Sequence, residues 1–126
     1  MLKPSVILQR VLDLVVSPDQ LTCGVYGRDK DGNPSQAPNL VSWCTVGAVA
    51  QVLYDEGYIW TVPGEQFTPD TINLYNDTMR HIRKAARLVS SCKVTEWSDR
   101  VVAKGHYSRW QRTIMRARNL AMEAGE

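Results

Sequence analysis

Residues 41–50 read Val-Ser-Trp-Cys-Thr-Val-Gly-Ala-Val-Ala, and this stretch decides the fold that we expect. Ser42 precedes an apolar run, and a hydroxyl there can accept a hydrogen bond from a free backbone N–H group of a starting helix. We therefore expect a helix from Trp43 to about Glu56, ended by Gly57. Its small residues let a neighbouring segment approach closely, so this helix should be central in the fold.

The composition is that of a single soluble domain over residues 1–126. Hydrophobic residues make up 44% of the chain and charged residues 22%, values typical of a folded rather than a disordered protein. The apolar segment 6–16 is interrupted by Gln9, Arg10 and Asp13, which argues against a signal peptide or a membrane span. We therefore expect a cytoplasmic protein without membrane association.

The three cysteines are Cys23, Cys44 and Cys92, an odd number at wide spacings. This pattern predicts reduced thiols rather than a disulfide framework. A Cys3His metal site could be drawn from them and one histidine, but they lack the ligand spacing of common zinc sites. We expect no metal and no cofactor.

The predicted fold is a compact, mainly α bundle of about four helices with two long ordered loops. The first helix is capped by Ser5 and runs to about Val16, the third is capped by Thr68, and the last begins near His106 or Ser108. The loops span residues 21–40 and 58–67, and the second should fold over the core as a lid. A short β piece is expected at 94–97, before a turn at 98–100, and residues 25–26 could also be extended.

Two helices carry an apolar seam on one side and basic residues on the other. The third helix repeats apolar residues at spacings of three and four: Ile72, Tyr75, Met79, Ile82, Ala86 and Val89. The last helix repeats the design with Tyr107, Trp110, Ile114, Ala117 and Ala121. We expect both seams to face the core, with His81 on the exposed side.

Charge is distributed unevenly along the chain. Residues 1–77 contain four basic and nine acidic residues, a net charge of −5, whereas residues 78–118 contain eleven basic and two acidic residues, a net charge of +9. Such asymmetry favours an acidic or polyanionic partner, although the two halves could also complement each other internally. The candidate binding residues are Arg80, Arg83, Lys84, Arg87, Arg109, Arg112, Arg116 and Trp97.

A second candidate site joins Cys44 to His106, both near predicted helix starts. The helix dipole would lower the pKa of a first-turn thiol, and imidazole could shuttle its proton in attack on an acyl carbon. Asp99 or Ser98 would orient the histidine. The competing interpretation is that Cys44 is a small buried hydrophobic residue, which is the commoner role of a cysteine on an apolar helix.

Three motifs in the same order resemble those of a family of small uncharacterised proteins from actinobacteria and bacteriophages. They are an Arg-Asp-x-x-Gly loop at 28–32, a Trp-Cys-x-x-Gly-Ala helix at 43–48, and a Ser-Asp…His stretch, where Ser98 replaces the family's usual asparagine. The resemblance implies a bacterial or phage origin and supplies no activity.

The sequence therefore favours a non-enzymatic binding protein, such as a phage accessory or anti-host factor. Its basic helices would engage an acidic protein surface, a nucleic acid or another phosphate-bearing ligand. The apolar seams of the third and last helices could also form the interface of a homodimer. The alternative is a small cysteine hydrolase or transferase using Cys44 and His106, so enzymatic activity stays an open question.

Overall fold

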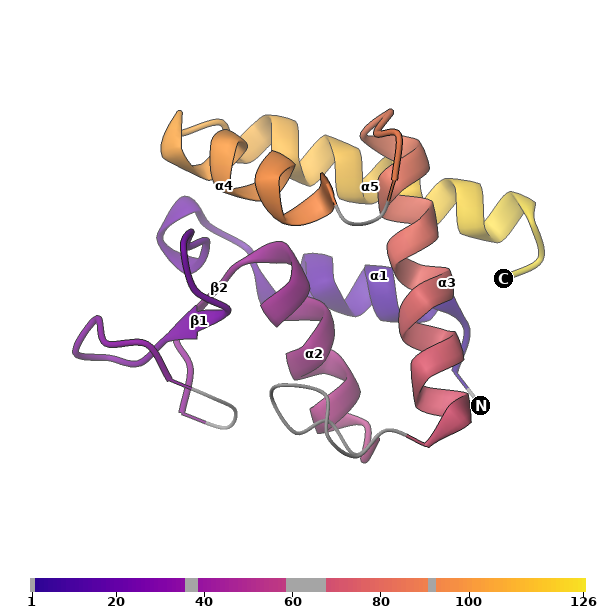
Figure 1. The fold of residues 1–126 in the computed structure, drawn as a ribbon, viewed down its shortest axis with the longest axis horizontal. Coiled ribbons are helices and arrows are strands. Elements are labelled where there is room, and N and C mark those ends of the chain that lie inside the picture. Colours follow the sequence, from indigo (N-terminus) through magenta and orange to yellow (C-terminus); the bar gives the residue numbers. More distant parts are fainter. Residues whose placement is uncertain (1, 36–38, 59–67, 91–92) are drawn as a thin grey trace.

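The computed structural model describes residues 2–35, 39–58, 68–90 and 93–126. These residues form five α-helices, a short 3-10 helix and a two-stranded sheet (Figure 1). The elements are α1 (Pro4–Leu14), η1 (Pro18–Gln20), β1 (Gly27–Arg28), β2 (Ser42–Trp43), α2 (Thr45–Asp55), α3 (Pro69–Ala85), α4 (Val94–Ala103) and α5 (Tyr107–Glu123). The expected lid at 58–67 lies outside the described residues except for its first residue, Tyr58.

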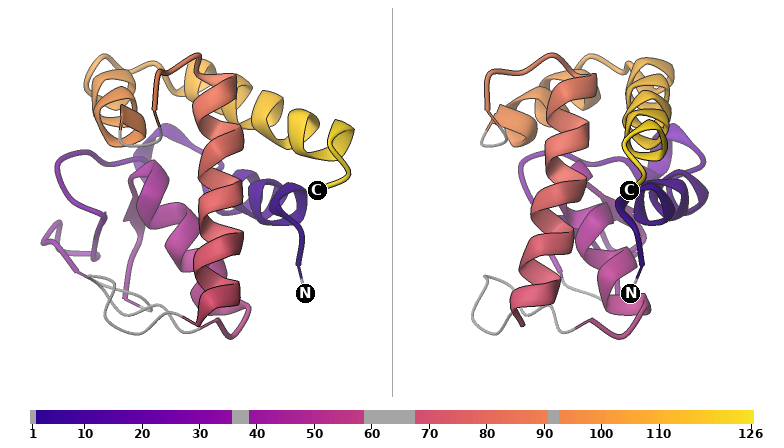
Figure 2. Two further views of the ribbon diagram at one scale, coloured as in Figure 1. Left: turned by 45° about the vertical axis from the view of Figure 1, so that its right-hand side comes forward. Right: turned by 90° about the vertical axis from the view of Figure 1, so that its right-hand side faces the viewer.

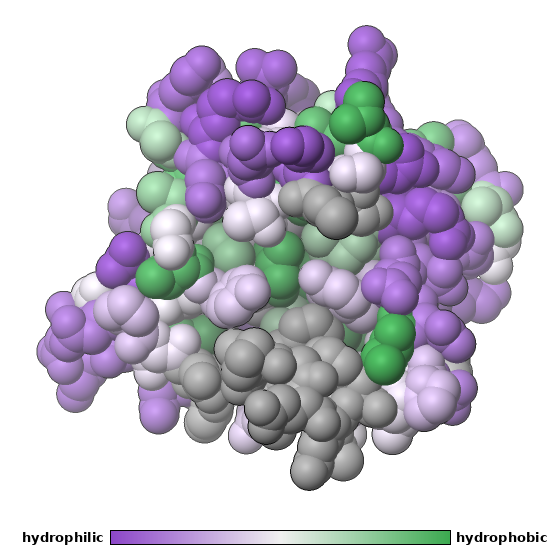
Figure 3. Space-filling view, in the orientation of Figure 1, coloured by the Kyte–Doolittle hydropathy of each residue, from purple (hydrophilic) through white to green (hydrophobic). Residues whose placement is uncertain are grey.

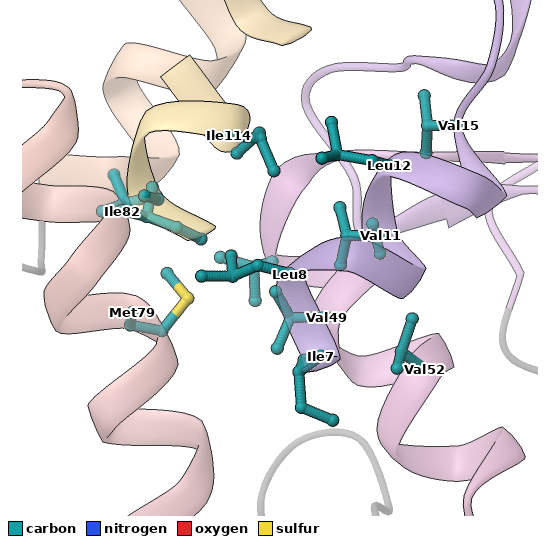
Figure 4. Close-up of a cluster of buried hydrophobic side chains, with 14 of the residues drawn as sticks. Ile7, Leu8, Val11, Leu12, Val15, Val49, Val52, Met79, Ile82 and Ile114 are labelled. Atoms are coloured by element: carbon teal, nitrogen blue, oxygen red, sulfur yellow. The ribbon is translucent and has the colours of Figure 1, made fainter. Parts of the chain in front are cut away.

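Helix α5 packs against three of the other four described α-helices. It contacts α1, α3 and α4, while α2 packs against α1 and α4 (Figures 1 and 2). The side chains between them are mostly apolar, and Figure 4 shows the hydrophobic cluster at their centre. The labelled members come from four helices and the residue that follows α1: Ile7, Leu8, Val11, Leu12, Val15, Val49, Val52, Met79, Ile82 and Ile114.

Helix α2 begins two residues later than the sequence predicts. Ser42 and Trp43 pair with Arg28 and Gly27 in the antiparallel sheet, so the first helical residue is Thr45. The capping side chain is that of Cys44, whose Sγ accepts a hydrogen bond from the Gly47 N–H at 3.3 Å. The end of the helix agrees with the prediction, because Gly57 adopts a φ of +84° just beyond it.

Gly47 lets the loop before β1 contact the backbone of α2 directly. A Cβ atom at this position would lie 1.9 Å from the Tyr26 carbonyl oxygen. The same oxygen accepts a hydrogen bond from the Cys44 N–H at 3.0 Å. The close approach expected of this small-residue helix is therefore made by a loop.

Helix α3 starts where the sequence predicts, with Thr68 as its cap and Pro69 as its first residue. Thr68 Oγ1 accepts from the Thr71 N–H at 3.2 Å. The predicted seam is only partly right: Met79 and Ile82 are buried, but Ile72 is 39% exposed and Val89 is 88% exposed. The buried face is centred instead on a neighbouring row of Leu74, Thr78, His81 and Ala85.

Helix α4 replaces the predicted strand at 94–97 and the predicted turn at 98–100, which is why the structure has five helices rather than four. Its buried residues are Val94, Trp97, Ser98 and Val101. That spacing of three, four and seven is the period of one helical face, so helical packing overrides the strand propensity of the β-branched residues.

The first and last helices meet near residue 126. Helix α1 begins after Lys3, and Ser5 does not cap it; instead the Ser5 hydroxyl and N–H both donate to the Glu126 backbone oxygen, at 3.0 and 3.2 Å. Helix α5 begins after His106, as predicted, and buries Trp110, Ile114, Ala117 and Ala121 completely.

Candidate anion-binding site

Four arginines surround one hollow of about 340 Å³ where α3, α4 and α5 meet. Its lining residues are Ala85, Ala86, Arg87, Trp97, Arg109, Arg112, Thr113 and Arg116. In the space-filling view, hydrophilic residues predominate at the top of the molecule, with some hydrophobic residues among them (Figure 3). We call this feature the arginine hollow. Its volume lies within the range of about 300–1,000 Å³ that is typical of small-ligand sites.

The helical period of α5 aligns three of these arginines. Arg109, Arg112 and Arg116 are exposed and lie at i, i+3 and i+7, so they share one face of the helix. Burial of Trp110 and Ile114 on the opposite face fixes that orientation. The small side chains of Ala85 and Ala86 leave room for the hollow beside them.

Arg87 reaches the hollow from an unusual backbone conformation. Its φ is +59°, and it is the only non-glycine residue with positive φ in the described part of the chain. It follows the last residues of α3, where glycine is usually found because a Cβ atom is unfavourable there. The chain thus places a guanidinium group at the hollow in a position that disfavours arginine.

Within the described residues, none of the four arginines of the hollow forms an ion pair with a carboxylate. Their charges are therefore available to a ligand. A guanidinium group presents its N–H donors in a planar fork that fits carboxylate and phosphate oxygens. Such a group of donors would suit an anion with several oxygen acceptors.

The other predicted basic residues do not line the hollow. Arg80 is paired with Asp77 at 2.6 Å and with Glu126 at 3.0 Å, and Arg83 donates to the Leu88 carbonyl at 3.4 Å. Lys84 is exposed on α3. The two predicted basic stripes therefore contribute unequally, with all of the α5 stripe and only Arg87 of the α3 stripe at the hollow.

Trp97, one of the candidate binding residues, lines the arginine hollow, but it is not open for stacking. It is only 5% exposed. Trp110 is fully buried, and the Tyr107 hydroxyl donates to the Val15 carbonyl at 2.9 Å. These aromatic rings are used for packing, so what they leave exposed at the hollow is charge rather than a ring face.

The prediction that His81 is exposed is wrong. It is 2% exposed because it lies on the buried row of α3, and its Nε2 is 3.3 Å from Glu126 Oε1. Its Nδ1 has no hydrogen-bond partner among the described residues. His81 therefore helps to hold residue 126 against α3.

Cys44 and His106 occupy different environments. Cys44 is 3% exposed and its sulfur accepts from Gly47, whereas His106 is exposed at the start of α5. Asp99 Oδ1 accepts from the Gly24 N–H at 3.3 Å rather than orienting the histidine. The hydrolase or transferase hypothesis gains no supporting geometry from the described residues.

The pKa of the Cys44 thiol is raised above its ordinary value of 9.0, chiefly because burial disfavours the thiolate. Hydrogen bonds from backbone N–H groups act in the opposite direction but are weaker, and the charge of Asp99 raises the pKa further. The expected lowering by the helix start is therefore outweighed. A thiol held neutral is a poor nucleophile.

Metal-ligating residues are not grouped in the described part of the chain. No cluster of three or more His, Cys, Asp or Glu side chains is placed there to hold a metal ion. Cys23 and Cys44 are free thiols, and Cys92 lies outside the described residues. Among the described helices, none is long and apolar enough to cross a membrane.

A model of a protein family matches residues 1–107 of the chain. The chain belongs to DUF6197, a family of unknown function. This confirms the expectation of an uncharacterised family. The DUF6197 match includes Arg87 and Trp97 and ends at the first residue of α5, so the three α5 arginines lie beyond it. No curated protein and no solved structure matches the chain.

Within the DUF6197 segment, the Arg-Asp-x-x-Gly loop holds itself together. The Arg28 guanidinium donates to Thr22 Oγ1 at 2.8 Å and to the carbonyls of Gly32 and Cys23 at 3.0 and 3.3 Å. Asp29 Oδ1 accepts from the N–H groups two and four residues later. We assign this motif a structural role.

Sequence reasoning missed a buried hydrogen-bond network behind the Trp-Cys motif. Thr45 Oγ1 lies 2.6 Å from Ser98 Oγ and accepts from Trp110 Nε1 at 2.9 Å, joining α2, α4 and α5. All three side chains are at most 1% exposed. The only sequence signal for this network is the presence of polar residues on otherwise apolar helical faces. That signal does not identify which residues are hydrogen-bonded to each other.

Proposed function

We propose that this protein is a non-enzymatic binding protein that captures an acidic partner at the arginine hollow. The observation that carries the proposal is the convergence of Arg87, Arg109, Arg112 and Arg116 on one hollow without a described carboxylate partner. Because a single exposed ion pair contributes only about 0.2–1 kcal/mol, the site depends on several arginines acting on one ligand. Binding should therefore weaken as salt rises.

The resemblance to actinobacterial and phage proteins extends this proposal to a cellular setting. A phage accessory or anti-host factor would act by occupying an acidic surface of a host component in the cytoplasm. Such a role requires affinity and no catalysis, in keeping with a buried Cys44.

Retention on immobilised heparin, a generic polyanion, tests the proposal. The site variant combines Arg109→Gln, Arg112→Gln and Arg116→Gln. The matched control combines Lys30→Gln, Arg100→Gln and Lys104→Gln, which removes the same charge from exposed residues outside the hollow. Circular dichroism establishes that both variants are folded.

We expect the site variant to elute at clearly lower salt than the control, because only the site variant loses convergent donors. Equal elution of the two variants would mean that retention follows net charge alone. That result would overturn the proposed function.

A further inference from the structure

A second hollow lies on the other side of two of the same arginines. It measures about 360 Å³ and is lined by residues of α5 alone: Arg112, Met115, Arg116, Asn119, Leu120 and Glu123. Arg112 and Arg116 line both hollows. A ligand held by this pair can therefore extend along α5 from one hollow into the other.

The second hollow offers apolar contact next to charge. Met115 is 40% exposed, and Leu120 is partly buried against the core. Methionine is flexible and adapts to irregular apolar groups, and methionine and arginine are both enriched in protein interfaces. A partner that uses this hollow gains most if it carries an apolar side chain.

Two features disfavour a nucleic acid as the occupant. Glu123 lines the second hollow and would repel a phosphodiester backbone that follows α5. The aromatic rings near the arginine hollow are buried, so bases cannot stack on Trp97 or Trp110. Both features are compatible with a peptide whose acidic and apolar side chains are separated along its length.

We propose that the partner is an acidic protein segment that also carries an apolar side chain. Its carboxylates occupy the arginine hollow, and its apolar side chain packs between Met115 and Leu120. From Arg112 to Leu120 the helix rises roughly 12 Å, a distance that about four extended residues span. This inference rests on the proposed function and names its partner class.

Three labelled probes test the inference by fluorescence anisotropy. The first is a peptide of four glutamates, two serines and a terminal pair of leucines; the second replaces the leucines with serines; the third is a short single-stranded oligothymidylate. The protein is used as wild type, as Met115→Ser, as Met122→Ser and as the triple arginine variant. Met122 is 62% exposed on the same helix but does not line the hollow, which makes it the matched control.

We expect the leucine-containing peptide to bind wild type about fivefold more tightly than the serine peptide, a difference of about 1 kcal/mol. Met115→Ser should abolish that preference, Met122→Ser should retain it, and the arginine variant should weaken binding of both peptides.

Each opposing result has a separate meaning. Tighter binding of oligothymidylate than of either peptide, unaffected by Met115→Ser, would overturn the inference in favour of a nucleic acid and leave the proposed function standing. Arginine-dependent dimerisation in sedimentation would make a second copy of the chain the occupant and also overturn it. Unchanged binding of every probe by the arginine variant would overturn the proposed function itself.

Discussion

Trp110 Nε1 donates to Thr45 Oγ1 at 2.9 Å, and both side chains are completely buried. Because the same hydroxyl contacts Ser98 Oγ, Thr45→Val should leave Trp110 Nε1 without its acceptor and leave Ser98 Oγ with only the hydrogen bond from the Thr45 N–H, at 3.3 Å. We expect a loss of roughly 2 kcal/mol in the free energy of unfolding, measured by urea denaturation. Thr113→Val, which removes a hydroxyl in a more exposed setting, should change it by less than about 0.5 kcal/mol. Equal losses would show that the network does not stabilise the fold.

Gly47→Ala tests the contact between α2 and the loop before β1. In an ordinary helix interior this change stabilises by about 1 kcal/mol. Here the new Cβ would lie 1.9 Å from the Tyr26 carbonyl oxygen, so we expect destabilisation by at least about 2 kcal/mol. Urea denaturation gives the sign of the change in the free energy of unfolding. A variant more stable than wild type would disprove the contact.

Arg87→Gly separates stability from binding. A non-glycine residue at positive φ destabilises the folded state by about 1–2 kcal/mol, and glycine removes this cost. Glycine also loses more backbone entropy on folding, which offsets part of the benefit. We therefore expect the free energy of unfolding to rise by about 0.5–1 kcal/mol. Retention on heparin should nevertheless fall because the hollow loses a guanidinium group. Arg87→Gln should reduce retention without the gain in stability. Unchanged retention in both variants would remove Arg87 from the site.

Alkylation by iodoacetamide tests whether Cys44 is reactive. Burial raises the pKa of its thiol, so Cys44 should react slowly near neutral pH and quickly only in denaturant. Peptide mapping by mass spectrometry should find the half-buried Cys23 modified first. Rapid modification of Cys44 in the folded protein would revive the cysteine hydrolase hypothesis.

Stability should decrease at high pH through Tyr75. Burial raises the pKa of Tyr75 from 10.0 to about 12. A raised pKa in the folded state means that the stabilisation is fully present below pH 10.0 and is lost as pH rises towards 12. In urea denaturation between pH 9 and 11.5, Tyr75→Phe should lose less stability above pH 10 than wild type. Parallel curves would contradict this assignment.

The sequence predicts α3 and α5 well because each has a local start signal and a long amphipathic repeat. Helix α4 was missed because it is short and rich in β-branched residues, and its helical spacing is evident only once Trp97 and Val101 are known to be buried. The seam of α3 was misplaced because both candidate rows contain apolar residues. Packing against α1 and α5 selects the row that contains His81.

The candidate site, like the fold, is predicted from the sequence only in part. Spacing alone places the α5 arginines together, but it cannot distinguish Arg87 from Arg80. Arg80 differs because it pairs with Asp77, three residues before it, and with Glu126, which is far away in the sequence. The reactivity of the Cys44 thiol likewise depends on burial by elements distant in the sequence rather than on its place at a helix start.

The most direct test of the central claim is isothermal titration calorimetry with tripolyphosphate, a compact polyanion, at low salt. We predict saturable binding at a single site in wild type. Binding should weaken at least ~10-fold in Arg112→Gln/Arg116→Gln, because charge-assisted hydrogen bonds contribute most of the affinity. The Arg100→Gln/Lys104→Gln control should bind like wild type. Absence of saturable binding, or equal affinity in the two double variants, would contradict the claim that the arginine hollow is an anion-binding site.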